Sequence, residues 1–175
     1  SLRDSVQGGD ILLYPTWYDA AENHITRLLY QEAAIQSAGP VPELTPENLA
    51  EMSQSPDERT RYFVAEACGT AGGQAAAAIL ESLMQDSSPV VAKHALESLA
   101  NGQVPISPPV VDALLARLNG GKDALQNALR PFVADALGAG GEIAVPGLTA
   151  MLNSEQKAVW PYALRALGKT GTKAP

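Results

Sequence analysis

One ten-residue phrase returns four times along this chain, and the repetition constrains the fold more than any other feature. Each copy has a ring-bearing side chain at its fourth position, then a run rich in small apolar residues, and a final Gly or Ala. The copies are residues 60–69, 91–100, 129–138 and 159–168. Their final residues are about 31, 38 and 30 positions apart. A period in this range is typical of a solenoid, in which each unit buries its apolar face against its neighbours.

The segments between the copies predict a partner helix for each repeat. Apolar residues recur at helical spacing in these segments, which are 74–85, 110–118 and 143–152. Four pairs of a hydroxyl residue and a proline predict helix starts, because the hydroxyl can cap a free N–H and proline tolerates the first helical position. These pairs are Thr45-Pro46, Ser55-Pro56, Ser88-Pro89 and Ser107-Pro108. A further helix is expected to start at Thr16 and to stop at Gly39-Pro40.

The sequence therefore predicts an all-α solenoid of about four helical pairs. We expect the repeat array over residues 43–175 and an irregular segment with an N-terminal capping helix over residues 1–42.

The repeated phrases resemble the short HEAT-like repeats found in phycobilisome lyase subunits and in many bacterial scaffold proteins. In that pattern an acid precedes Val-Arg, and alanines lead to Ala-Leu-Gly before a turn. The matching residues are Asp57, Arg61, Ala65, Ala67 and Gly69 in the first copy, Arg130, Ala134, Ala136, Leu137 and Gly138 in the third, and Ala166, Leu167 and Gly168 in the last. The second copy departs at Ala92 and Ala100, and the fourth at Trp160. The resemblance implies a right-handed superhelix, and it implies that Arg61 and Arg130 form ion pairs or backbone contacts between repeats.

Composition narrows the classes of partner. The net charge of -7 argues against nonspecific nucleic-acid binding, which requires clustered Lys and Arg. The single cysteine excludes an intrachain disulfide framework, and no zinc-type spacing is present. No apolar run has the length of a membrane span, and no signal peptide is visible. These features predict a cytoplasmic protein without a membrane span, cofactor or metal.

Two residues with reactive side chains have structural interpretations. His94 shares the fourth position of the phrase with Phe63, Phe132 and Tyr162, so it is expected to pack between helices. Cys68 occupies the position that holds leucine in the other copies, which predicts a buried thiol. We therefore expect no catalytic residue.

A polar surface on the repeated helices is the candidate binding site. Glu66, Glu97 and Asp135 share one position in three successive repeats, so stacking should align them in an acidic row on the concave face. Their neighbours one turn earlier include Tyr62 and Lys93, and the last repeat places Arg165 at the acid position. An ordinary solvated face is the alternative interpretation.

The leading functional expectation is a non-enzymatic adaptor, scaffold or assembly factor. It would bind, through this face, a partner protein that has a basic surface. The alternative is an accessory subunit of a lyase or chromophore-handling complex related to phycobilisome lyases. A third interpretation, a DNA-binding HEAT domain, requires a basic concave face and is opposed by the net charge. The sequence leaves the oligomeric state open.

Overall fold

The computed structural model describes residues 20–120 and 124–171, and every regular element in this part of the chain is helical. Its helices are α1 (Ala20–Ser37), α2 (Leu49–Met52), α3 (Glu58–Ala71), α4 (Gly73–Leu83), α5 (Pro89–Ala100), α6 (Pro108–Gly120), α7 (Ala124–Ala139), α8 (Val145–Leu152) and α9 (Trp160–Thr170). Two short 3-10 helices, η1 (Gly141–Ala144) and η2 (Lys157–Val159), precede α8 and α9. No described helix has the length and apolar character needed to cross a membrane.

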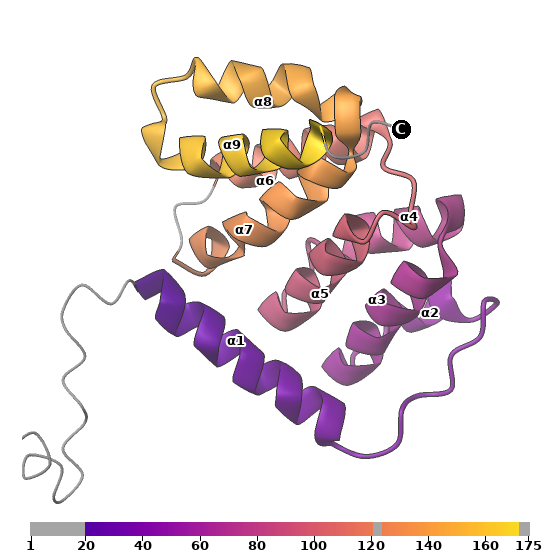
Figure 1. Cartoon of the computed structure of the whole chain (residues 1–175). Helices are drawn as coiled ribbons and strands as arrows, with labels where there is room; N and C mark the ends of the chain where they lie inside the picture. Colours follow the sequence, from indigo (N-terminus) through magenta and orange to yellow (C-terminus); the bar gives the residue numbers. More distant parts are fainter. Residues whose placement is uncertain (1–19, 121–123, 172–175) are drawn as a thin grey trace, which may run out of the picture.

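The helices form four successive pairs. The four repeated phrases lie on α3, α5, α7 and α9, which we call the B helices; their partners α2, α4, α6 and α8 are the A helices. Each B helix packs on the B helix of the next repeat and on its own A helix (Figure 1). This arrangement confirms the predicted all-α solenoid of helical pairs.

Helix starts were predicted correctly at two of the hydroxyl–proline pairs. Helix α5 begins at Pro89, and the Ser88 side chain accepts a hydrogen bond from the backbone N–H of Val91. Helix α6 begins at Pro108, as expected.

The other two starts lie a few residues later than predicted. At α3 the N-cap is Asp57, whose carboxylate accepts bonds from the backbone N–H groups of Arg59 and Thr60. A carboxylate can accept two such bonds and also complements the positive end of the helix. The residues after Thr45 form a turn, and α2 begins only at Leu49.

Arg61 links the first repeat to the second, as the resemblance implied. Its guanidinium donates two hydrogen bonds to the carboxylate of Asp86, at 2.7 and 2.9 Å. It also donates to the backbone carbonyl of Ser55, at 2.8 Å. Asp86 in turn accepts from the backbone N–H of Ser88, so one ion pair fixes the turn that precedes α5.

Small residues set the spacing of neighbouring B helices. A Cβ atom placed on Gly69 would lie 2.7 Å from Oγ of Ser98, and one on Gly138 would lie 2.6 Å from Cβ of Lys169. Ser98 also donates to the backbone carbonyl of Ala65 at 3.0 Å, which ties α5 to α3. Gly69 and Gly138 therefore leave room for the following B helix, whereas Ala100 holds the same position where α7 packs on α5.

Cys68 and His94, the two residues with reactive side chains, lie on B helices at the positions that the repeat alignment predicted. Cys68 is fully buried, and burial raises the pKa of its thiol to about 11. Phe63 is buried, whereas His94, Phe132 and Tyr162 are partly buried at the equivalent positions.

Helix α1 lies across the B helices rather than on the end of the stack. Its contacts are with α7, α5 and α3, so it spans three repeats (Figure 1). The predicted helix start at Thr16 falls outside the described residues. Of the α1 side chains from His24 onward, Leu28 is buried, at 2% exposed, while Leu29 and Tyr30 are 51% and 75% exposed. The helix therefore covers the B helices with few apolar contacts of its own.

Substituting the final glycines tests the close approach of the B helices. Gly69→Ala should lower the free energy of unfolding by roughly 1–3 kcal/mol, because the added methyl group meets a serine that is already hydrogen-bonded to backbone. Gly168→Ala is the matched control, since a Cβ there meets no atom within 4 Å. Its replacement should be neutral or stabilising by up to about 1 kcal/mol. Urea unfolding of both variants measures the difference; equal effects would contradict the packing role of Gly69.

Candidate functional site

The side of the B helices that faces α1 carries the polar residues predicted from the repeat alignment. The N-terminal halves of α3 and α5 hold Arg59, Tyr62, Lys93 and His94, which contact or face α1; we call these four residues the cradle. The C-terminal halves of the same helices line a cavity whose wall also includes His94. The two halves therefore provide different surfaces.

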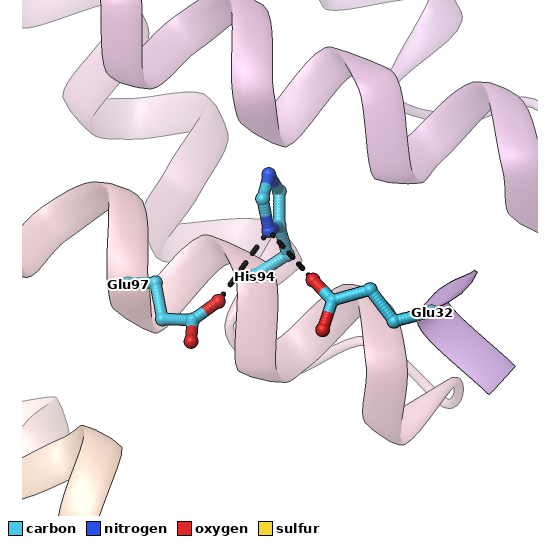
Figure 2. A group of neighbouring side chains, drawn as sticks. All are labelled: Glu32, His94 and Glu97. Carbon is cyan, nitrogen blue, oxygen red and sulfur yellow. Dashed lines mark ion pairs between the residues drawn. The ribbon is translucent and has the colours of Figure 1, made fainter. Parts of the chain in front are cut away.

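Glu32 of α1 is the centre of the contacts with the cradle. The Tyr62 hydroxyl donates a hydrogen bond to its carboxylate at 2.9 Å, and the Lys93 ammonium lies 2.8 Å from it. Nδ1 of His94 lies 3.4 Å from Glu32 and 3.4 Å from Glu97 of its own helix (Figure 2). One acidic side chain thus joins α1 to both α3 and α5.

Lys93 is a buried cation held by two carboxylates. It is 3% exposed, and its ammonium lies 2.8 Å from an oxygen of both Glu32 and Glu97. It also lies 5.2 Å from the centre of the Phe132 ring, within cation–π range. Because removing a lysine from water is costly unless the charge is paired, the two glutamates are needed for its burial.

These charges shift the pKa values of the cluster in opposite directions. The contact with His94, followed by the contacts with Lys93 and Tyr62, lowers the pKa of Glu32 to about 2 despite burial. Burial alone would lower the pKa of His94, but Glu32 and Glu97 outweigh it and raise that pKa. With His94 protonated, two cations face two anions and the cluster is neutral.

The cluster has the donor types of a metal site but is already balanced by Lys93. A nitrogen of His94 and an oxygen of each of Glu32 and Glu97 lie within 4.8 Å of one another, and such ligands bind zinc or iron in other proteins. The Lys93 ammonium bonds to both carboxylates, however, and an ion between them would have to displace this buried cation. We therefore interpret the cluster as an ion-pair network that holds α1.

Two adjoining cavities lie over the C-terminal halves of the B helices. One, of about 480 Å³, is lined by Glu66, His94, Glu97 and Asn101 among others. The second, of about 270 Å³, shares Glu97 and Asn101 with it and extends to Asp135. We call the two cavities together the B-helix groove. Its walls include Glu66, Glu97 and Asp135, the three acids predicted to form a row.

Two of the three acids are neutralised by neighbouring cations. Asp135 accepts two hydrogen bonds from Arg165, at 2.7 and 2.8 Å, and lies 2.7 Å from the ammonium of Lys169. Glu97 is paired with Lys93. Glu66 is exposed and has no ion pair with the described residues. The expected acidic row is therefore a line of ion pairs with one unbalanced carboxylate.

Tyr62 and Lys93 do not have the exposure expected for them. Both are buried, at 0% and 3% exposed, because α1 covers the part of the face on which they lie. The repeat alignment predicted the position of these side chains but gave no signal that another helix lies over them. Glu32, Gln36 and Arg59 were missed because all three lie outside the repeated phrases, although their partners lie within them.

The titration of His94 tests whether the cluster holds α1. Because the pKa of His94 is raised, its positive charge stabilises the docking of α1 fully below about pH 6.5. This stabilisation is lost as the pH rises through the pKa of the folded state. The lowered pKa of Glu32 means that its contribution is present above about pH 4.5 and is lost as the pH falls toward about 2. Docking of α1 should therefore be strongest between about pH 4.5 and pH 6.5.

In proton NMR titrations, Glu32→Gln should lower the pKa of the His94 imidazole, because one of its two facing carboxylates loses its charge. The chain has two histidines, so a His24→Gln variant assigns the signals. An unchanged pKa of His94 in Glu32→Gln would show that α1 is not docked in solution as described.

Comparison with known proteins supports the repeat assignment. The model of the HEAT repeats family matches residues 45–131. The comparison with curated proteins gives no match. The narrower resemblance to phycobilisome lyase subunits stays a prediction.

A similar solved structure is human deoxyhypusine hydroxylase in complex with glycerol, with a TM-score of 0.60 and 21% sequence identity. The match covers 86% of this chain but 57% of that protein, and at this identity it shows the fold alone. The expectation of a non-enzymatic protein is contradicted by this neighbour, which is an enzyme. The helical pairs and the family match over residues 45–131 support HEAT-like repeats in this chain, and the solved structure supports the fold alone.

Proposed function

We propose that the chain is a protein-binding module that receives a segment of another protein in the B-helix groove. The observation that carries this proposal is the pair of adjoining cavities, about 480 and 270 Å³, that crosses the B helices beside α1. HEAT repeats generally mediate protein interactions, and stacked helices offer a continuous surface on which an extended or helical segment can lie.

The charges of the groove favour a partner with a mixed polar surface over a uniformly basic one. The carboxylates of Glu97 and Asp135 already have cationic partners, so they can accept hydrogen bonds without demanding a further cation. Glu66 is the position at which a partner lysine or arginine gains an ion pair. Asn101 and Gln103 add amide groups that can donate or accept hydrogen bonds along the same wall.

A site-specific crosslinking experiment identifies the partner and tests the face together. A photoreactive side chain is placed at Glu66 or Asn101 in the groove, and at Asp112 on α6 as a control; all three are exposed. Partners captured from native lysate at the first two positions but not at Asp112 are then purified. Capture at Asp112 alone would place the binding surface on the A helices and contradict the proposal.

The purified partner then allows a quantitative prediction. Glu66→Lys should raise the dissociation constant by roughly tenfold, because it replaces an attraction by a repulsion. It should also lessen the dependence of binding on salt. Asp112→Lys makes the same change of charge outside the groove and should leave the affinity within about twofold. Isothermal calorimetry at two salt concentrations measures both, after circular dichroism has confirmed that the variants fold. Equal affinities of the two variants would contradict the proposal.

A further inference from the structure

The contacts between α1 and the cradle have the form of helix recognition. They lie on one stripe of α1, since Leu28, Glu32 and Gln36 follow one another at intervals of four residues. Leu28 is the buried apolar residue, Glu32 bonds to Tyr62 and Lys93, and Gln36 donates to the Tyr62 hydroxyl at 2.9 Å. This stripe of α1 thus presents a buried apolar residue, a carboxylate and an amide in that order, and the last two bond to the cradle.

Arg59 adds contacts that do not depend on the side chains of α1. Its guanidinium donates to three backbone carbonyls at the C-terminal end of the helix and just beyond it, those of Ile35 at 2.9 Å, Gly39 at 2.7 Å and Pro40 at 2.6 Å. The last carbonyls of a helix lack partners within the helix and carry partial negative charge. A cation at this place therefore interacts with the end of a helix whatever its sequence. The Phe63 ring lies 4.8 Å from this guanidinium and supports it from the other side.

The attachment of α1 is polar enough to be exchanged. Among the side chains of α1 from His24 onward, Leu28 alone is buried, whereas a helix belonging to a core shows an apolar stripe. On release of α1, Lys93 and His94 would keep the Glu97 carboxylate beside them.

We propose that the cradle is a second interaction site, which binds a helix of a partner protein in place of α1. That helix carries an apolar residue, a glutamate and a glutamine or similar amide at successive intervals of four residues. The partner is thus an acidic amphipathic helix, complementary to the cations Arg59, Lys93 and His94. This site adjoins the B-helix groove at His94 but binds a different segment, so its test does not depend on the function proposed above.

The covalent connection of α1 to the rest of the chain sets the affinity that a partner helix needs in order to displace it. Because α1 is part of the same chain, its effective concentration at the cradle is high, of the order of millimolar for a short flexible connection. A free copy of the same helix should therefore bind poorly to the wild-type chain and well to a chain whose own α1 is weakened. This difference separates recognition in the cradle from nonspecific binding.

A labelled peptide of residues 20–40 is the probe, and fluorescence anisotropy with the full chain is the measurement. The peptide should bind the variants Glu32→Gln and Leu28→Ala at least about tenfold more tightly than the wild type, because each weakens α1 and leaves every cradle residue intact. Glu43→Gln, an exposed change outside α1, should behave as the wild type. Two independent variants are used so that misfolding of one cannot decide the outcome.

Substitutions in the peptide and in the cradle test the recognition chemistry. A peptide in which the residue equivalent to Glu32 is glutamine should bind the Leu28→Ala chain at least about tenfold more weakly, and added salt should weaken the unmodified peptide. Lys93→Met in the Leu28→Ala chain should abolish binding, whereas Lys157→Met, an exposed lysine on η2, should not change it.

Three results would overturn the proposal. One is the absence of peptide binding to both α1 variants up to millimolar concentration. Another is equal binding of the glutamate and glutamine peptides. The third is dimerisation of the wild-type chain that is lost in Glu32→Gln, which would assign the cradle to the α1 helix of a second copy. The Glu66→Lys experiment tests the groove alone, so each site can fail without the other.

Discussion

Close packing of successive B helices is the constraint on which the rest of the structure depends. No single repeat could bury its apolar face by itself, and the helices approach closely because Gly69 and Gly138 leave room for the side chains of the following repeat. Ser98 uses this proximity to bond to the backbone of α3. A row of helices fixed in this way places residues of equivalent sequence position side by side, which is why both the cradle and the groove cross more than one repeat.

The same packing explains how a lysine can be buried on a surface that a partner helix covers. The stem of Lys93 lies against the neighbouring repeat, with its ammonium over the Phe132 ring, while the charge is paired with Glu97 on its own helix. A second carboxylate must come from outside the repeats, and Glu32 supplies it. The burial of Lys93 is therefore a consequence of α1 docking and not a property of the repeats.

The repeated phrase was sufficient to predict the helical pairs and the buried thiol of Cys68, because both depend on positions that recur with the period. The link made by Arg61 was implied by the family resemblance instead. The phrase also predicted that Glu66, Glu97 and Asp135 would lie along one face. The position of α1 could not be predicted in this way, since Glu32 lies 61 residues from Lys93 and belongs to no repeat. The pairing of Asp135 was missed although the alignment placed Arg165 at the equivalent position of the next repeat; only Lys169, which follows the phrase, gave no signal.

The cradle and the groove share His94, and Glu97 of the groove contacts Lys93 of the cradle, so events at one surface reach the other. While α1 is docked, Lys93 and a protonated His94 face two carboxylates, and the charges balance. When Glu32 leaves with α1, Lys93 and His94 face Glu97 alone, and the wall of the groove that contains His94 and Glu97 loses a neighbouring negative charge. Such a change alters the potential within roughly a Debye length, which is about 8 Å at physiological salt. Because linkage is reciprocal, a ligand in the groove that prefers the more positive wall would favour release of α1, and one that carries a cation toward Glu97 would favour its docking.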